Sequence, residues 1–234
     1  NGVVYPTNAL VLFSDDELRN SMFHYAKVEC ARFKGTGSEE FIDQKSVMTN
    51  IAIQAEEAYN FVLRHINKGA TVEGVYTVSH CEYPIKAVRE AIRIAIVHRD
   101  YLMSGSDIKI AVYDSKIEIT SPGTFPKGIT LDEIISGRSE IRNRVIARVF
   151  KEAELIEQWG RGIQQIYKLC LDNGLLKPDI IESGMFVQLR FYRKDYNLNN
   201  KIEHLNNGRK KWTKKVDEKS GRKHQYRSEE RRVG

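Results

Sequence analysis

The stretch REAIRIAIVHRDY, from Arg89 to Tyr101, and the stretch DIKIAVYDSKIEITSPG, from Asp107 to Gly123, decide the fold of this chain. The first has the spacing of an amphipathic helix that packs on a sheet. The apolar face of this helix consists of Val88, Ala91, Ile92, Ala95 and Ile96. Glu90 begins the opposite face, and Ile94 and His98 follow one and two turns later. A carboxylate there, followed by two strands and a Gly-containing turn, predicts a site between helix and sheet whose simplest occupant is a nucleotide.

The second stretch predicts two antiparallel strands joined by a tight turn. Apolar residues alternate with polar or small residues on both sides of Asp114–Lys116. Ser121-Pro122-Gly123 then ends the second strand in a turn, where glycine permits close approach of the backbone to a ligand. Further along the chain, Met185–Arg193 alternates as an edge or terminal strand.

Three helices are predicted between these strands. Thr130–Ser136 forms a short helix, Arg142–Glu157 has the apolar spacing of a longer one, and Ile163–Leu171 forms the third. Gly160 and Gly162 open the third helix. Glycines at this place expose backbone N–H groups beside the positive end of the helix dipole, an arrangement that binds phosphate.

The N-terminal part of the chain carries no chemistry by itself. The apolar run Ala9–Phe13 predicts a strand, and Ala26–Gln44 predicts a β-hairpin. Met48–Ile66 has the periodicity of one long helix, and Thr71–His80 predicts a single strand.

Composition excludes several classes of protein. The chain has 234 residues, of which 41% are hydrophobic, and no apolar run approaches the ~20 residues of a membrane span. We therefore expect a soluble, cytoplasmic protein without a membrane partner. The three cysteines are scattered and have no paired spacing with histidine, so neither a disulfide framework nor a metal site is predicted.

The positive charge is confined to the end of the chain. The formal net charge is +6, but Lys201–Gly234 alone holds 12 basic and 5 acidic residues. The remaining part holds 25 basic and 26 acidic residues, and it is therefore not basic. Any affinity of this chain for the phosphates of DNA would rest on the tail.

Four motifs occur in an order that resembles a known family. They are REA-x-x-x-A-x-x-HRDY, DIKIAVYDSKIEITSPG, RN-x-x-IA and LIEQWGRGI. From about Thr7 to Arg193 the chain resembles the C-terminal ATPase-like domain of bacterial RecG-related helicases and transcriptional regulators. Those proteins usually carry a Schlafen AlbA-type DNA-binding domain upstream. The ATPase-like domain resembles the GHKL group, which includes the histidine-kinase-type ATPases.

The resemblance implies an α+β fold. Its core is a GHKL-like ATPase sandwich, a mixed β-sheet with helices on one face, preceded by a partial α/β domain. Residues 1–70 would be the remnant of an AlbA-type domain with a connecting hairpin and long helix, and residues 71–195 the GHKL-like ATPase domain. Residues 196–234 would be a disordered basic tail, whose closing RSEERRVG resembles a translated sequencing adapter.

The resemblance also implies site residues. In GHKL proteins a glutamate activates water, and Glu90 matches this catalytic residue; the asparagine that holds magnesium one turn later is replaced by Ile94, which cannot bind a metal. Gly123 ends a Ser-Pro-Gly that stands where an acidic residue and a glycine read adenine. The implied nucleotide-binding residues are His98, Arg99, Asp100, Gly123, Arg142, Asn143, Gly160 and Gly162. ATP is the implied ligand, whereas magnesium and hydrolysis stay open.

Two functions remain as hypotheses. The first is an ATP-binding regulatory module of a bacterial transcriptional regulator or RecG-like helicase-related protein, which forms a homo-oligomer and contacts DNA through domains absent from this chain. The second is a degenerate, non-catalytic domain for dimerisation or protein interaction in a DNA-binding regulator. Ile94 and the missing acidic residue before Gly123 are the features that separate the two.

Overall fold

The structure is a computed structural model that describes residues 5–73, 76–156 and 161–194, with the backbone alone for residues 68–73 and 76–80. The predicted basic tail and Gly160 lie outside the described residues.

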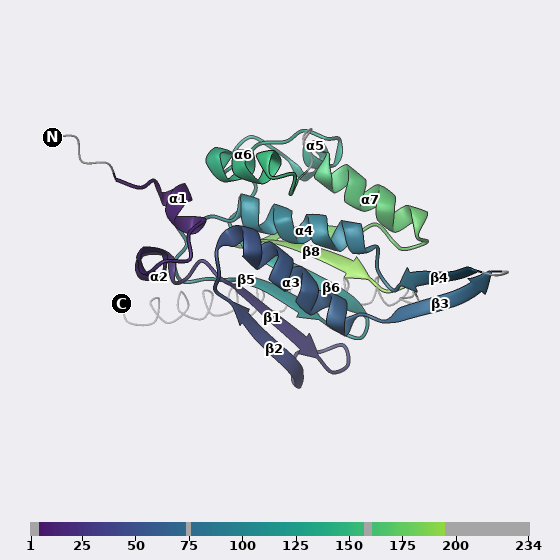
Figure 1. Ribbon diagram of the computed structural model, residues 1–234. Coiled ribbons are helices and arrows are strands. Elements are labelled where there is room, and N and C mark those ends of the chain that lie inside the picture. Colours follow the sequence, from purple (N-terminus) through teal and green to yellow (C-terminus); the bar gives the residue numbers. More distant parts are fainter. Residues whose placement is uncertain (1–4, 74–75, 157–160, 195–234) are drawn as a thin grey trace, which may run out of the picture. The chain divides into compact units, whose positions relative to one another are not determined.

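A mixed six-stranded sheet forms the centre of the fold (Figure 1). Its strands are β1 (Val28–Phe33), β2 (Phe41–Val47), β5 (Ile108–Val112), β6 (Lys116–Pro122), β7 (Asp179–Ser183) and β8 (Phe186–Tyr192), in the order β2-β1-β5-β6-β8-β7. Only the β1–β5 pair is parallel among these neighbours, and the other pairs are antiparallel. β1 and β2, which were assigned to a preceding domain, are thus strands of this same sheet.

The strand register brings the apolar residues onto one face. Cys30, Ile110, Ile119, Leu189 and Ile180 are successive partners across five strands, and all five are buried. Side chains alternate between the two faces of a strand, so the intervening polar residues point to the opposite face. The helices must cover the apolar face to remove it from water.

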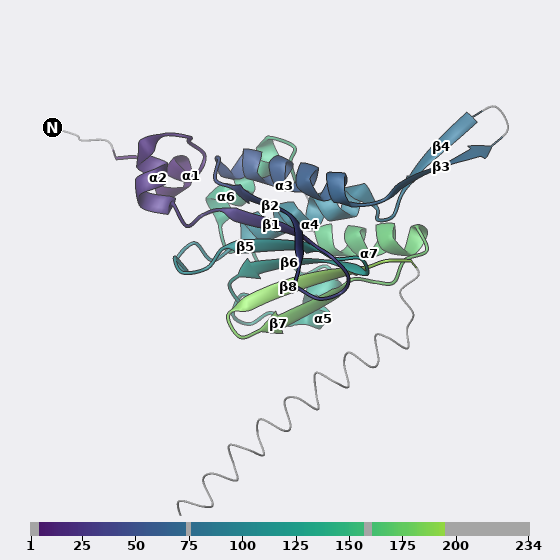
Figure 2. The same ribbon diagram turned by 90° about the horizontal axis from the view of Figure 1, so that it is seen from below.

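Three long helices provide this cover: α3 (Ile51–His65), α4 (Ile85–His98) and α7 (Gly162–Asp172) (Figure 1). Seen from below in Figure 2, the strands lie in front of α4 and α7. The shorter helices are α1 (Asn8–Leu12), α2 (Glu17–Phe23), α5 (Leu131–Ile135) and α6 (Arg144–Glu152). The predicted α+β class, a mixed sheet with helices on one face, is confirmed.

Helix α4 is central because it contacts the sheet, α3 and α7. Its predicted apolar face is confirmed, since every residue of that face is at most 7% exposed. Fully burying an aliphatic side chain of this size contributes roughly 1.5–3 kcal/mol, so this face anchors the whole helical layer. Ala91 and Ala95 of this face, together with Glu90, Ile94 and His98, also line the cavity described below.

Two predictions in the N-terminal half were wrong. Ala9–Phe13 is not a strand but belongs to helix α1, which begins where the Thr7 hydroxyl accepts a hydrogen bond from the Leu10 amide. The predicted single strand Thr71–His80 is an antiparallel pair, β3 (Lys68–Glu73) and β4 (Tyr76–Cys81). Both views show this pair extending away from the central sheet (Figures 1 and 2).

The helix expected over Arg142–Glu157 is shorter, because α6 ends at Glu152 and Glu154 has a left-handed φ of 56°. Strand β7 was not predicted. Within the described residues, no helix is both long enough and apolar enough to cross a membrane.

Candidate functional site

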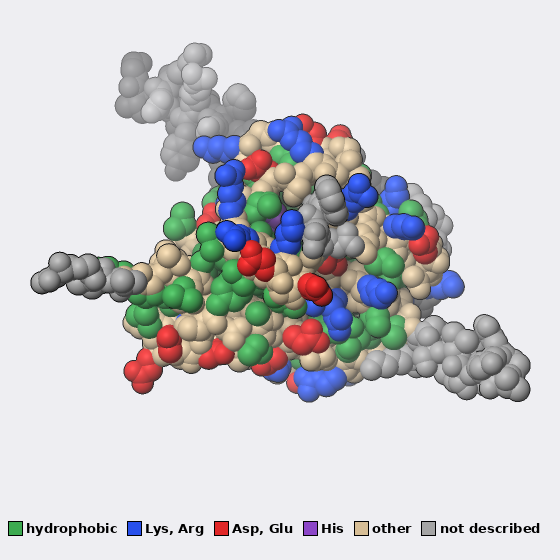
Figure 3. Space-filling view, turned by 45° about the horizontal axis from the view of Figure 1, so that its top comes forward, with side chains coloured by type: hydrophobic (Ala, Val, Ile, Leu, Met, Phe, Trp, Pro, Cys, Tyr) green, Lys and Arg blue, Asp and Glu red, His purple; other side chains and the backbone are tan. Residues whose placement is uncertain are grey.

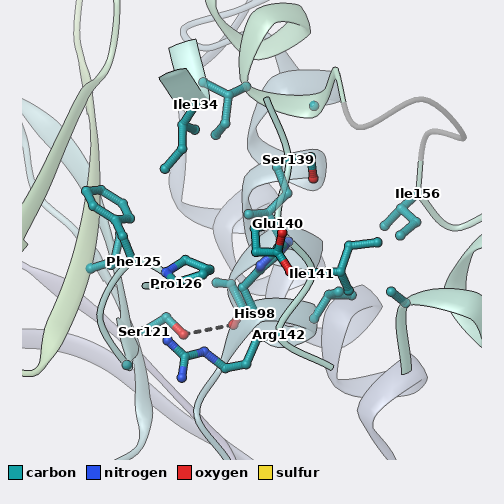
Figure 4. Close-up of a pocket in the computed structure, with 18 of the residues that line it drawn as sticks. His98, Ser121, Phe125, Pro126, Ile134, Ser139, Glu140, Ile141, Arg142 and Ile156 are labelled. Carbon is teal, nitrogen blue, oxygen red and sulfur yellow. Dashed lines mark hydrogen bonds between the residues drawn. The ribbon is translucent and has the colours of Figure 1, made fainter. Parts of the chain in front are cut away.

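A cavity of about 450 Å³ lies between α4, the β6–β8 part of the sheet and the segment that holds α5 and α6. Its size is that of a small-molecule site, for which about 300–1,000 Å³ is typical. Much of the lining is apolar and comes from distant parts of the chain: Ile94, Ile119, Phe125, Ile134, Ile163 and Leu189. In Figure 4 the side chains of Phe125, Pro126 and Ile134 stand on one side of the hollow, and His98 and Ser121 lie below.

Helix α4 presents the predicted polar face to this cavity. Glu90, Ile94 and His98 all line it, because residues four apart stack on one side of a helix. Ser121 from β6 also lines the cavity, and its hydroxyl donates a hydrogen bond to the Ala95 carbonyl at 2.8 Å. This bond fixes α4 against the end of β6.

Gly162, the first residue of α7, lies very close to α4. A Cβ atom added to Gly162 would lie 2.7 Å from Oε1 of Glu90 and 2.8 Å from Cδ1 of Ile94. The lack of a side chain therefore allows the N-terminus of α7 to approach the Glu90 carboxylate, where a negative charge is favourable. Glu90 and Gly162, which the sequence analysis selected separately, thus meet at one wall of the cavity.

Gly123 lines the same cavity at the end of β6. Its φ is +118°, a backbone conformation that residues with a Cβ rarely adopt. A Cβ here would also lie 3.1 Å from Cβ of Asp100. Two backbone hydrogen bonds fix this turn. The Gly123 amide donates to the Met185 carbonyl, and the Asp100 amide donates to the Pro122 carbonyl, each at 2.8 Å.

Arg142 and Asn143 connect the segment before α6 to the end of α4. The Arg142 guanidinium lines the cavity, donates to Oδ2 of Asp100 at 3.2 Å and donates to the Thr124 carbonyl. The Asn143 amide donates to the carbonyls of Val97 and Arg99 at 2.8 and 2.7 Å. Asn143 does not line the cavity; it satisfies carbonyls at the end of a helix, which have no partner within the helix.

Arg99 and Asp100 lie outside the cavity lining. Arg99 is 1% exposed, and its guanidinium donates to the backbone carbonyls of Tyr25 at 2.9 Å, Ser106 at 2.7 Å and Lys27 at 3.3 Å. Burial lowers the pKa of Arg99 from its usual value. Arg99 therefore holds together the chain around β1 and the end of α4. Asp100 does not line the cavity, but it pairs with Arg142, which does.

His98 is uncharged at neutral pH. Its burial, and then the positive charge of Arg142, lower the pKa of His98 to about 4. A neutral imidazole offers one N–H donor and one nitrogen acceptor. His98 can therefore make hydrogen bonds in the cavity without adding charge to it.

The sequence analysis missed most of the cations that surround the cavity. We call this group the basic rim; it comprises Arg138, Arg142, Arg144, Arg148 and Lys151. The last three occupy positions i, i+4 and i+7 of α6, so one face of this helix is basic. That spacing was visible in the sequence, but only the apolar spacing of the same helix was considered. Figure 3 shows Lys and Arg side chains gathered over this part of the helical layer.

Of the predicted site residues, the cavity lining thus includes Glu90, His98, Gly123, Arg142 and Gly162. Comparison with known protein families covers part of this region and leaves out α4 with Glu90 and His98. Residues 105–191 match the family model described as "Putative ATP-dependent DNA helicase recG C-terminal". This match spans β5 to β8 and the basic rim, so that part of the chain resembles an ATPase-like domain of RecG-related proteins.

One solved structure supports the fold assignment. The DIP2311 protein from Corynebacterium diphtheriae is similar to this chain with 25% sequence identity and a TM-score of 0.65. The similarity covers 72% of this chain and 35% of the DIP2311 chain, so this chain spans about a third of that relative. No curated protein sequence matches the chain.

Proposed function

We propose that this chain is a nucleotide-binding module and that ATP occupies the cavity between α4 and the sheet. The observation that carries the proposal is the combination of an apolar interior with the basic rim at its mouth. A nucleotide needs both, because its base is flat and weakly polar whereas its phosphates are strongly anionic. The match of residues 105–191 to a RecG-related ATPase-like domain supports the same ligand.

In the whole protein, this module would act in a bacterial transcriptional regulator or RecG-like helicase-related protein. DNA would be bound by other domains, such as an AlbA-type domain, and the module would respond to the nucleotide. Binding rather than hydrolysis is the core of the proposal, because the Glu90 carboxylate lies against the start of α7 and next to the aliphatic Ile94. We also propose that the whole protein forms a homo-oligomer, as expected from the sequence.

Titration of the full chain with a fluorescent ATP analogue tests this function. We expect saturable binding below about 1 mM, a modest free energy for a ligand of this size. The variant Ser139→Trp places a large ring in the exposed loop at the cavity and is expected to weaken binding at least about tenfold, or about 1.4 kcal/mol. Ser104→Trp is the matched control, since Ser104 is also exposed but does not line the cavity. Equal effects of the two variants would contradict the assignment of the cavity.

One observation favours a second function. Ile94 places an aliphatic side chain in the cavity beside Glu90, as a domain that has lost catalysis would. Such a domain would serve dimerisation or protein interaction. Sedimentation of the full chain with and without ATP separates the two functions: a stable dimer that neither binds ATP nor responds to it would favour the second.

A further inference from the structure

The wall of the cavity does not suit a magnesium ion, which the resemblance to GHKL ATPases implies. Mg²⁺ takes oxygen ligands in a nearly octahedral arrangement. One turn after Glu90, the side chain that faces the cavity is the hydrocarbon of Ile94. Glu90 and Glu140 are the carboxylates of the lining, and the described residues contain no group of three His, Cys, Asp or Glu side chains that could hold a metal.

The basic rim offers a different source of positive charge. Arg138 and Arg142 already pair with Glu133 and Asp100, but the other three cations belong to one face of α6 and are exposed. Magnesium bound to a nucleotide neutralises part of the phosphate charge, and guanidinium and ammonium groups can do the same by direct, charge-assisted hydrogen bonds.

The cations of α6 are available for a ligand. Arg148 pairs with Glu152 at 2.8 Å, but both side chains are mostly exposed, at 78% and 63%. Arg144 lies 4.0 Å from Glu140 in a similarly exposed pair. Exposed ion pairs of this kind are weak and exchange readily. In the described part of the chain, no carboxylate lies within ion-pair distance of Lys151.

We propose that the cavity takes the nucleotide as a free polyphosphate, without a metal ion, and that α6 supplies the counter-charge through Arg148 and Lys151. This inference rests on the proposed function and deepens it by naming the form of the ligand. Free ATP carries more negative charge than its magnesium complex. The basic rim should therefore bind free ATP at least as tightly as the complex.

Isothermal titration of the full chain with ATP, once in excess EDTA and once in excess magnesium chloride, tests the inference. We expect equal or tighter binding in EDTA. Binding that is at least about tenfold tighter in magnesium would overturn the metal-free ligand and leave the proposed nucleotide function standing. Failure of ATP to bind in both solutions would overturn both.

A variant pair tests the role of α6. The double variant Arg148→Ala with Lys151→Ala is expected to weaken ATP binding about tenfold. Loss of one exposed cation weakens binding by up to about fivefold, and the double variant loses two. AMP, which has one phosphate, should lose less than about twofold. Lys109→Ala is the control, because Lys109 is exposed on β5 and does not line the cavity. ATP affinity that stays unchanged in the double variant, or a loss that is equal for AMP, would overturn the assignment of the counter-charge to α6.

Discussion

Replacing Gly123 with alanine tests how the cavity is built. At a φ of +118°, a residue with a Cβ costs about 1–3 kcal/mol of backbone strain. The new Cβ would also lie 3.1 Å from Cβ and 3.3 Å from the amide nitrogen of Asp100, and such overpacking adds about 1–3 kcal/mol. Reduced freedom of the unfolded chain returns about 0.4–1 kcal/mol. We therefore expect Gly123→Ala to lower the free energy of unfolding by about 1–5 kcal/mol, with about 3 kcal/mol as the central value.

Urea denaturation of the full chain measures this loss, and two glycines serve as controls. Gly105 has no atom within 4 Å of an added Cβ and no positive φ, so Gly105→Ala should be nearly neutral. Gly184 has a φ of +61° in open space, so Gly184→Ala should show only the left-handed backbone cost of about 1–2 kcal/mol. A loss for Gly123→Ala within about 0.5 kcal/mol of that for Gly105→Ala would refute the reasoning.

Three further predictions concern the cavity and the end of α4 beside it. Asn143→Ala should lower the free energy of unfolding in urea by about 1–3 kcal/mol, because two carbonyls at the end of α4 lose their donor. The pKa of His98 is about 4 in the folded chain and near 6.5 in the unfolded chain, so between these pH values the unfolded chain binds one more proton. The free energy of unfolding should therefore fall by about 2–3 kcal/mol as the pH drops from 6.5 to 4. His98→Gln should remove this slope when denaturation is measured as a function of pH. Gly162→Ala should shift the Glu90 carboxylate, with a loss of thermal stability below about 1 kcal/mol, and weaken binding of the fluorescent ATP analogue.

The predictions for Asn143 and His98 each have a control of the same type. Asn173→Ala removes a single, exposed bond to a helix carbonyl and should cost less than Asn143→Ala. His24→Gln changes an exposed histidine and should keep the slope of the unmodified chain. The predictions are wrong if these substitutions behave like those at the cavity.

The sequence predicted the parts of the fold that depend on long apolar periodicity. The buried face of α4 and the β5–β6 pair follow from such patterns. The short run Ala9–Phe13 was misassigned because five apolar residues fit a strand or a helix equally well, and the cap by Thr7 decided for the helix. In the region of β3 and β4, alternating residues predicted one strand, although Gly74 is a typical turn residue.

The site was predictable only in part. Glu90, Gly123 and Gly162 could be selected from the sequence because spacing and glycine chemistry mark them. Arg99 could not be placed, because whether an arginine at a helix end meets phosphates or backbone carbonyls depends on which loops pack around it. The structure shows that the carbonyls of Tyr25 and Lys27, more than 70 residues away in the sequence, and of nearby Ser106 surround it.

The parallel pairing of β1 with β5 has a consequence for how the chain folds. Residues 34–107 lie between these two strands, so their pairing closes a long loop, whereas β1 and β2 meet across a short one. Contacts between residues far apart in the sequence form slowly. During synthesis, the β1–β2 hairpin must therefore wait with one edge unpaired until β5 has left the ribosome, and this interval is when the nascent chain is most open to aggregation.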